Sequence, residues 1–287
     1  MKITRKDALK SMAGLTLTGT FGLPKINFSD KRKNKQTFKH SVCRWPYGDQ
    51  SLEELCEAAI DIGIDSIELL SPKNWPVVQK YGLTCAMANP EEFEIPVGFN
   101  APNNHGKLQN VYRDLIPKVA DAGLKNLICF SGNRNGLDDE TGLENCATGL
   151  DPLIELAEKH EVIICMELLN SKVDHPDYQC DHTEWGVKLV DKIGSPNFKL
   201  LYDIYHMQIM EGDIIATIRK YSDYIAHYHT GGVPGRNEID ETQELNYKAI
   251  MEAISETGFE GFVGQEFIPS RDDDFESLKQ GVEICSV

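Results

Sequence analysis

Four polar residues stand at or near the ends of four apolar runs in the second half of this 287-residue chain. They are Glu167, Asp203, His229 and Glu266. The runs cover residues 162–170, 198–206, 224–232 and 261–269. Because they lack the alternation of a half-exposed strand, each run predicts a buried parallel strand. About one strand–helix unit separates each polar residue from the next, so the four side chains are expected at one rim of a parallel barrel.

Two glutamates, one aspartate and one histidine form a ligand set for one divalent metal ion. Three carboxylates and a neutral imidazole suit Mn²⁺ or Mg²⁺, with Zn²⁺ and Co²⁺ as alternatives, although Zn²⁺ favours more His or Cys ligands. Such an ion would stabilise the enediolate that forms when a proton leaves the carbon beside a carbonyl group. Two carboxylates of the set could then take up and return that proton.

The elements that must position these residues repeat as strand–helix units. Besides the four runs above, strands are expected at 40–45, 66–70, 84–89 and 126–131. Helices are expected at 51–62, near 75–81, at 107–122, within 148–160, near 183–193, 213–221 and 246–257, and at 273–285. Eight such units predict a (β/α)₈ TIM barrel, formed by residues 40–287 as a single domain. An open doubly wound sheet would usually carry a Gly-rich phosphate loop after its first strand, and residues 43–48 do not have that pattern.

Further polar and aromatic residues follow the same predicted strands. The substrate-binding candidates are His206, Arg236, Asn170, Arg44 and Trp45. They are expected at the catalytic rim of the barrel, because the chemistry of such barrels sits at the carboxyl ends of the strands. Each has a structural alternative: a buried histidine, a solvated loop charge, or a tryptophan that closes the core. His182 is a weaker candidate of the same kind.

The segment 202–212, with the sequence YDIYHMQIMEG, resembles the sixth-strand motif of hydroxypyruvate isomerases. These enzymes belong to the xylose-isomerase-like superfamily of barrels, together with ketose 3-epimerases and endonuclease IV, and the resemblance covers about residues 40–285. It implies that Glu167, Asp203, His229 and Glu266 are the metal ligands and that both glutamates act as acid–base groups. It also implies that His206 and Arg236 contact substrate.

Two departures from the hydroxypyruvate isomerase pattern concern the substrate. Those enzymes commonly have Gln at the third ligand position, whereas sugar 3-epimerases have His, as His229 is here. The segments 44–45 and 87–89 also lack the polar pattern expected for hydroxypyruvate. The resemblance therefore implies a metal-dependent isomerase of a small hydroxycarbonyl compound, with a ketose 3-epimerase or an inosose-type dehydratase as alternatives.

The charge of the chain bears on the remaining alternatives. From Ser41 onward the chain has 19 basic and 43 acidic residues, a net charge of −24. This charge disfavours an endonuclease IV-like enzyme, which must bind the phosphate backbone of nucleic acid. The expected partner is a small molecule, either hydroxypyruvate or a sugar. A sugar-binding protein on an inactive barrel would not need all four metal positions. The oligomeric state stays open between forms such as a homodimer and a homotetramer.

Residues 1–39 differ from the rest of the chain. The first 40 residues hold ten Lys or Arg against two Asp, and a weakly apolar stretch at 11–23 follows the charged start. This pattern predicts an export leader and linker. The segment 4–10 resembles a twin-arginine signal in which Lys6 replaces the second Arg. We therefore expect a periplasmic or otherwise exported protein, with a basic tail on a cytoplasmic protein as the alternative. The stretch is too short and polar for a stable membrane anchor.

Eight cysteines could in principle form disulfides in an exported protein. Four of them, however, lie on predicted core strands, where Cys acts as a small apolar residue. The sequence has no C-x-x-C pair, so a thiolate zinc site is not indicated. Mostly free thiols are expected.

Overall fold

Seven parallel strands form one curled sheet within residues 36–287, the part of the chain that this computed structural model describes. The strands are β1 (Lys39–Cys43), β2 (Ser66–Glu68), β3 (Asn126–Cys129), β4 (Ile163–Glu167), β5 (Phe198–Asp203), β6 (Ile225–Thr230) and β7 (Phe262–Gln265). Their order is β2-β1-β7-β6-β5-β4-β3. The expected leader lies outside the described residues except for 36–39. There, Phe38 is 3% exposed and β1 begins at Lys39, one residue before the boundary expected from sequence.

The sheet closes through the segment 84–88, which bridges β2 on one side and β3 on the other. Its contacts are isolated bridges, Leu70 to Ala88 and Ala88 to Leu127 among them, so the regular strand expected at 84–89 does not form. Side chains of neighbouring strands form the hydrogen bonds that the backbone of a regular strand would form. Ala86 N–H donates to Ser66 Oγ (2.8 Å), and Ala86 C=O accepts from Asn126 Nδ2 (3.0 Å). The predicted TIM barrel is confirmed, with the segment 84–88 as an irregular strand between β2 and β3.

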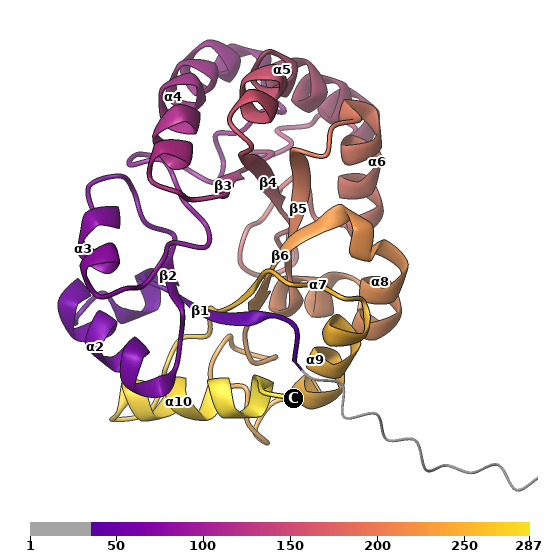
Figure 1. The fold of residues 1–287 in the computed structure, drawn as a ribbon. Coiled ribbons are helices and arrows are strands. Elements are labelled where there is room, and N and C mark those ends of the chain that lie inside the picture. Colours follow the sequence, from indigo (N-terminus) through magenta and orange to yellow (C-terminus); the bar gives the residue numbers. More distant parts are fainter. Residues whose placement is uncertain (1–35) are drawn as a thin grey trace, which may run out of the picture. The chain divides into compact units, whose positions relative to one another are not determined.

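Helices surround the sheet (Figure 1). They are α2 (Leu52–Ile62), α3 (Trp75–Lys80), α4 (Pro102–Asp121), α5 (Asp139–Lys159), α6 (Thr183–Ile193), α7 (Ile204–Met210), α8 (Ile214–Tyr221), α9 (Tyr247–Glu256) and α10 (Asp274–Cys285). Short 3₁₀ turns lie at η1 (Trp45–Tyr47) and η2 (Ser222–Tyr224). The ring of helices closes where α10 packs between α9 and α2. The capping box predicted at Ser51 is present, because Ser51 and Glu54 each accept a backbone N–H of the other.

Several element boundaries differ from the sequence prediction, and three of them have a clear local cause. The apolar run 198–206 does not stay extended to its end: β5 stops at Asp203 and α7 follows at once. The Asp203 carboxylate causes this change, since it accepts the backbone N–H of His206 (3.0 Å) as a helix N-cap. Helices α4 and α5 also begin earlier than predicted, at Pro102 and Asp139, because Pro suits a first helical position and Asp138 caps the other helix.

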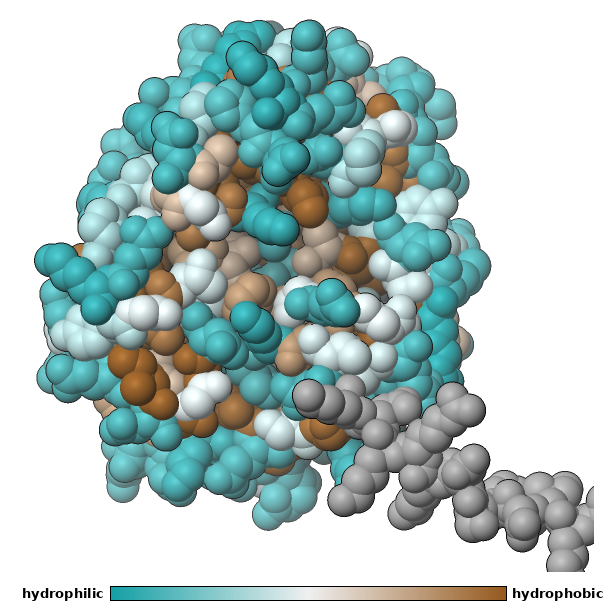
Figure 2. All heavy atoms as spheres, viewed as in Figure 1, coloured by the Kyte–Doolittle hydropathy of each residue, from teal (hydrophilic) through white to brown (hydrophobic). Residues whose placement is uncertain are grey.

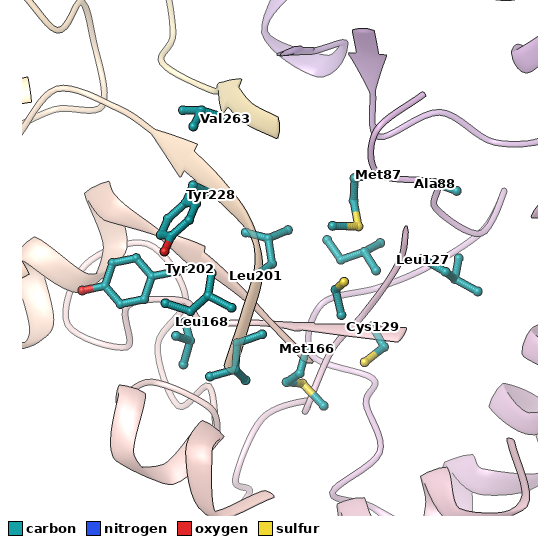
Figure 3. Packing of buried hydrophobic residues seen from close by; sticks show 14 of the residues in the cluster. Met87, Ala88, Leu127, Cys129, Met166, Leu168, Leu201, Tyr202, Tyr228 and Val263 are labelled. Carbon is teal, nitrogen blue, oxygen red and sulfur yellow. The ribbon is translucent and has the colours of Figure 1, made fainter. Parts of the chain in front are cut away.

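The core lies between the sheet and its helices. Figure 3 shows side chains of neighbouring strands packed together, with Tyr202 and Tyr228 edge to face at 6.1 Å between ring centroids. Hydrophilic residues cover the outer helices, while hydrophobic residues gather toward the centre of the face that Figure 2 shows. All eight cysteines are buried and free, as predicted. Within residues 36–287, no helix has the length and apolar character to cross a membrane.

Candidate metal-assisted active site

The sheet register brings the four predicted metal ligands to one rim. Asp203 and His229 are direct partners on β5 and β6. Glu167 ends β4, and Glu266 follows β7 immediately. One potential ligand atom from each of the four residues lies within 4.8 Å of the others, and all four residues are buried. The structure thus confirms that these residues, spread over 100 positions of sequence, form one cluster.

The atoms facing this cluster suit a metal ion better than they suit one another. His229 Nδ1 lies 2.9 Å from Glu266 Oε2 and 3.4 Å from Glu167 Oε1, yet it makes no well-oriented hydrogen bond. Asp203 Oδ2 is likewise buried without a hydrogen-bond partner. Buried polar atoms are costly when left unpaired, and lone pairs that converge on one point are the arrangement a cation satisfies. Glu167, Asp203, His229 and Glu266 would therefore hold a divalent ion.

Glu68, at the end of β2, is a site residue that the sequence analysis missed. Its Oε1 atom lies 2.6 Å from His229 Nε2 and 2.9 Å from His227 Nε2, and all three side chains are fully buried. Burial alone would raise the Glu68 pKa, but the charge of His227 and the hydrogen bonds from both histidines outweigh it and hold the pKa low. An ionised carboxylate only accepts hydrogen bonds, so His229 keeps a proton on Nε2. Nδ1, which faces the acidic cluster, is then the nitrogen that would bind a metal ion, with release of any proton it carries.

Glu68 also belongs to a second buried group, with Cys43 and His229. This group is a weaker metal site, because His229 Nε2 is already hydrogen-bonded to Glu68 and burial raises the pKa of the Cys43 thiol. The position of Gly264 shows how closely the carboxylate is packed: a Cβ atom there would lie 2.3 Å from Glu68 Oε1. A sequence signal did exist, since Glu68 is an acidic residue within the predicted strand 66–70, as Glu167 is within the apolar run 162–170.

The carboxylates differ in their electrostatic surroundings. Burial raises the pKa of Glu167, and the nearby charge of Glu266 adds to the effect. Burial and the same Glu266 charge also raise the pKa of Asp203. Burial opposes ionisation of Glu266 too, but the charges of His229 and Arg236 outweigh it and hold the Glu266 pKa low. Three carboxylates packed this closely repel one another, which a divalent cation would relieve.

Arg236 and Trp45 both contact Glu266, at the rim where the sequence predicted them. Arg236 Nη2 donates to Glu266 Oε2 (2.7 Å) and lies 3.5 Å from Asp203 Oδ2. Trp45 Nε1 donates to the other oxygen of Glu266 (2.8 Å). The Arg236 guanidinium lies 5.1 Å from the Trp45 ring centroid and 5.3 Å from that of Tyr205. Glu266 is therefore held on both oxygens by donors from two other loops.

His206 and Asn170 lie behind the metal ligands. His206 Nε2 is 3.7 Å from Asp203 Oδ2, and Asn170 Nδ2 is 2.7 Å from His206 Nδ1. Asn170 Oδ1 accepts the backbone N–H groups of Val173 and Asp174. Burial and the charge of Arg236 lower the His206 pKa, so the ring is neutral. Neither side chain lines the cavity described below, and their contacts support Asp203 and the loop after β4 instead.

Two candidates are not brought to the site. Arg44 turns back onto its own 3₁₀ turn, where it donates to the carbonyl groups of Tyr47 and Gln50. His182 lies in a separate hollow, with Nδ1 2.7 Å from Asp181 Oδ1. Sequence alone shows that a residue follows a strand, whereas the local turn decides where its side chain points.

A cavity of about 430 Å³ opens onto the metal cluster. Glu167 and Glu266 both line it, and so do Trp45 and Arg236. The remaining lining residues are Leu69, Asn89, Phe93, Ile95, Ile128, Phe130, Leu169 and His175. Two buried carboxylates, a cluster of possible metal ligands and a cavity of this size make this rim the candidate site for a small molecule.

The chain belongs to the family described as Xylose isomerase-like TIM barrel, whose profile matches residues 40–285. This match confirms the resemblance seen in the sequence. It agrees with the barrel that the strands and helices of this structure form.

Named relatives include several isomerases. The chain is 31% identical over 252 residues to the "Putative hydroxypyruvate isomerase" of Xenopus laevis, covering 84% of each protein. It is 26% identical over 234 residues to the hydroxypyruvate isomerase of Escherichia coli, covering 78% of this chain and 90% of that one. A human protein of the same name as the Xenopus one is 32% identical, over 41% of its own length.

Solved structures agree on the fold. An AP endonuclease, family 2, from Brucella melitensis has a TM-score of 0.75 at 21% identity, over 86% of this chain and 99% of that one. The D-psicose 3-epimerase of Clostridium cellulolyticum has a TM-score of 0.67 at 19% identity, over 87% and 100%. The IOLI protein with a bound zinc atom has a TM-score of 0.69 at 18% identity, over 87% and 98%. At these identities the likeness supports the barrel fold alone.

Proposed function

We propose that this protein is a divalent-metal-dependent isomerase that acts on a small hydroxycarbonyl compound through an enediolate. One observation carries the proposal: Glu167 and Glu266 belong to the metal cluster and also line the cavity where a substrate would bind. The names of the relatives, hydroxypyruvate isomerases among them, support the same reaction class. Mn²⁺ and Mg²⁺ are the ions that the ligand set favours, and the neighbour that holds zinc keeps Zn²⁺ as an alternative.

The residues of the site divide the work of proton transfer. Arg236 and Trp45 each donate to one oxygen of Glu266, which fixes the orientation of that carboxylate. The bound ion would supply electrostatic stabilisation for the two oxygens of the enediolate. One glutamate takes the proton from the carbon that carries the hydroxyl group beside the carbonyl. In isomerisation a proton returns to the former carbonyl carbon, and the hydroxyl proton passes to the former carbonyl oxygen. In epimerisation a proton returns to the same carbon from the opposite face. The buried surroundings of both carboxylates strengthen these interactions.

A ketose 3-epimerase is the second candidate function, and two observations favour it. His229 stands at the ligand position where sugar 3-epimerases have His. The two cavity-lining glutamates also come from strand ends that β5 and β6 separate in the sheet. Inversion of a carbon needs a proton acceptor and a proton donor on opposite faces of the enediolate, and two glutamates from separate strands suit that requirement.

The deciding experiment is a substrate screen in D₂O with the Mn²⁺-loaded protein. Hydroxypyruvate, ketoses and other hydroxycarbonyl compounds are incubated, and mass spectrometry or NMR reports deuterium entering at carbon. We expect metal-dependent exchange beside the carbonyl, which chelation abolishes. Carbonyl migration identifies an isomerase, whereas exchange with inversion identifies an epimerase. Fully Mn²⁺-loaded protein that exchanges no proton in any compound of the class would contradict the proposal.

We also propose that residues 1–35 direct export through a twin-arginine-like signal, on the charge pattern of the sequence. The test is the location of the full-length chain in its own host compared with a chain in which Arg5 and Lys6 are both replaced by Gln. Accumulation of both forms in the cytoplasm would contradict the proposal.

A further inference from the structure

The cavity over the metal cluster has two unlike halves. Its polar half holds Trp45, Glu167, His175, Arg236 and Glu266. Its other half is lined by Leu69, Phe93, Ile95, Ile128, Phe130 and Leu169, with Asn89 as the single polar side chain among them. The division follows the sheet, because the four metal ligands stand on or beside β4 to β7, whereas β2, β3 and the loop after residue 89 contribute most of the apolar half.

The apolar half lacks the groups that a polyhydroxylated or anionic chain would need. Neither Lys nor Arg is among its lining residues, so a carboxylate or phosphate has no partner there. Hydroxyl groups on successive carbons each need a hydrogen-bond partner once buried, and six of the seven side chains in this half offer none. A three-carbon acid would fill only a fraction of a cavity of about 430 Å³.

Phe93 and Phe130 give this half an aromatic surface. Their rings stack with centroids 5.3 Å apart and 14° between their planes. Phe130 is 6% exposed, while Phe93, on the loop after the segment 84–88, is 44% exposed. A large aromatic side chain that stays exposed beside a catalytic site is stabilised when a ligand covers it.

We infer that the substrate carries an apolar or aromatic substituent beside its hydroxycarbonyl group. The hydroxycarbonyl group lies against Glu167 and Glu266, and the substituent lies against Phe93 and Phe130. The position of the hydroxycarbonyl group rests on the proposed function. The apolar half of the cavity is the evidence for the apolar substituent. The substrate class is therefore an α-hydroxyketone with an apolar group, larger than hydroxypyruvate and less polar at its far end than a free ketohexose.

The test compares two probes that share one reactive group. Hydroxyacetone carries the α-hydroxyketone alone, and 1-hydroxy-4-phenylbutan-2-one adds a phenyl group through a short linker. Deuterium incorporation by the Mn²⁺-loaded full chain gives kcat/KM for each probe, with hydroxypyruvate and D-fructose measured alongside. Burial of a phenyl ring is expected to raise kcat/KM by about 30-fold over hydroxyacetone.

Variants of Phe93 test whether the higher kcat/KM of the phenyl probe depends on the aromatic pair. Phe93→Ser is expected to reduce the ratio of kcat/KM between the two probes to about threefold or less, since most of the ring contact is lost. Phe93→Trp should keep the preference. Val173→Ser is the matched control, because Val173 is 64% exposed on the loop after β4 and does not line the cavity. Exchange into hydroxypyruvate or D-fructose as fast as into the phenyl probe would overturn the inference and leave the proposed function standing.

A binding measurement tests the apolar substituent independently of the proposed reaction. If no probe exchanges, isothermal calorimetry of the phenyl probe with the Mn²⁺-loaded protein decides. Binding that Phe93→Ser weakens and Val173→Ser leaves intact would support the apolar substituent while the proposed function fails. Absence of binding by the phenyl probe would overturn the inference, whereas the proposed function fails only if no compound of the class exchanges.

Discussion

His229 Nε2 lies 2.6 Å from Oε1 of Glu68, and both side chains are fully buried. The contact joins β6 to β2 across the inside of the barrel, 161 positions apart in sequence. It sets which nitrogen of His229 carries the proton, and so which nitrogen faces Glu167, Asp203 and Glu266. A candidate metal ligand is held in this way by a partner outside the four-residue cluster.

Replacement of Glu68 by Ala is expected to weaken metal binding by about 10–100-fold, the usual effect of losing a partner behind a ligating histidine. Without the carboxylate, His229 is free to carry its proton on Nδ1, where the proton competes with the ion. Titration calorimetry with Mn²⁺ measures the affinity. The ¹⁵N shifts of the His229 ring in Mg²⁺-loaded protein report which nitrogen carries the proton.

Glu68→Gln should lie between Ala and the parent chain, because the amide oxygen can still accept from Nε2–H. Glu238→Gln is the matched control: Glu238 is also buried at this end of the barrel, but it bonds Ser270 and Ser277 rather than a metal ligand. Equal losses of metal affinity in Glu68→Ala and Glu238→Gln would point to general destabilisation instead of a positioning role.

Metal binding should appear in thermal stability. The protein is expected to bind about one divalent ion per chain, given one cluster of four ligands. Mn²⁺ at about 100 times its Kd adds about 2.7 kcal/mol to the unfolding free energy, which corresponds to a rise in Tm of about 5 °C or more. Differential scanning calorimetry with and without chelator measures the shift. A melting curve of proven metal-free protein that added Mn²⁺ does not move would refute this prediction.

Glu167→Gln and Glu266→Gln are each expected to lower turnover by about 10²-fold or more while the fold is retained. Gln keeps the size of the side chain and one metal-binding oxygen, so the change mainly removes the proton acceptor. Turnover and circular dichroism are measured on metal-loaded variants. Near-normal turnover in either variant would remove that glutamate from the mechanism.

Deuterium exchange in the same variants separates the two candidate reactions. For an epimerase, each single variant is expected to exchange a proton from its remaining face without completing inversion. For an isomerase that moves a carbonyl between adjacent carbons, one variant alone loses exchange, because a single glutamate can carry out the transfer.

His40 makes the stability of the barrel depend on pH. Burial lowers the pKa of His40 to about 4, with the charge of Asp65 acting in the opposite direction. The unfolded chain binds this proton near pH 6.5, so the unfolded state holds more protons between that pH and about pH 4. The unfolding free energy should therefore fall as the pH drops through this window, by about 2 kcal/mol at pH 5 from this group.

Urea unfolding at about pH 7 and pH 5 measures the effect. His40→Asn should show a smaller difference between the two pH values than the parent chain, by about the same 2 kcal/mol. If both chains lose the same stability on acidification, other groups account for the pH dependence.

Truncation tests where the folded unit begins. Deletion of residues 1–35 should leave stability and deuterium exchange unchanged. Deletion of residues 1–39 should destabilise the fold by about 2 kcal/mol or more, because it removes the buried ring of Phe38 and the first residue of β1. Calorimetry of both chains measures the difference. Equal stability of the two truncated chains would show that Phe38 contributes little.

The amino-acid sequence by itself determined the barrel and the meeting of four candidate metal ligands. Parallel strands buried on both faces leave long apolar runs, and a carboxylate or histidine at the end of such a run is conspicuous. Since equivalent strand ends meet at one rim, the positions of Glu167, Asp203, His229 and Glu266 in the chain were enough to predict their meeting. Short-range signals such as the capping box at Ser51 were equally visible.

Only the tertiary structure decided which other residues join them. Glu68 reaches His229 because the register places Gly264, without a side chain, in its path. Arg44 turns away because the 3₁₀ turn after β1 offers it backbone carbonyls, and Phe93 borders the cavity because its loop folds over Phe130. These contacts depend on loop conformation and on register between distant strands, and local sequence patterns do not encode either one.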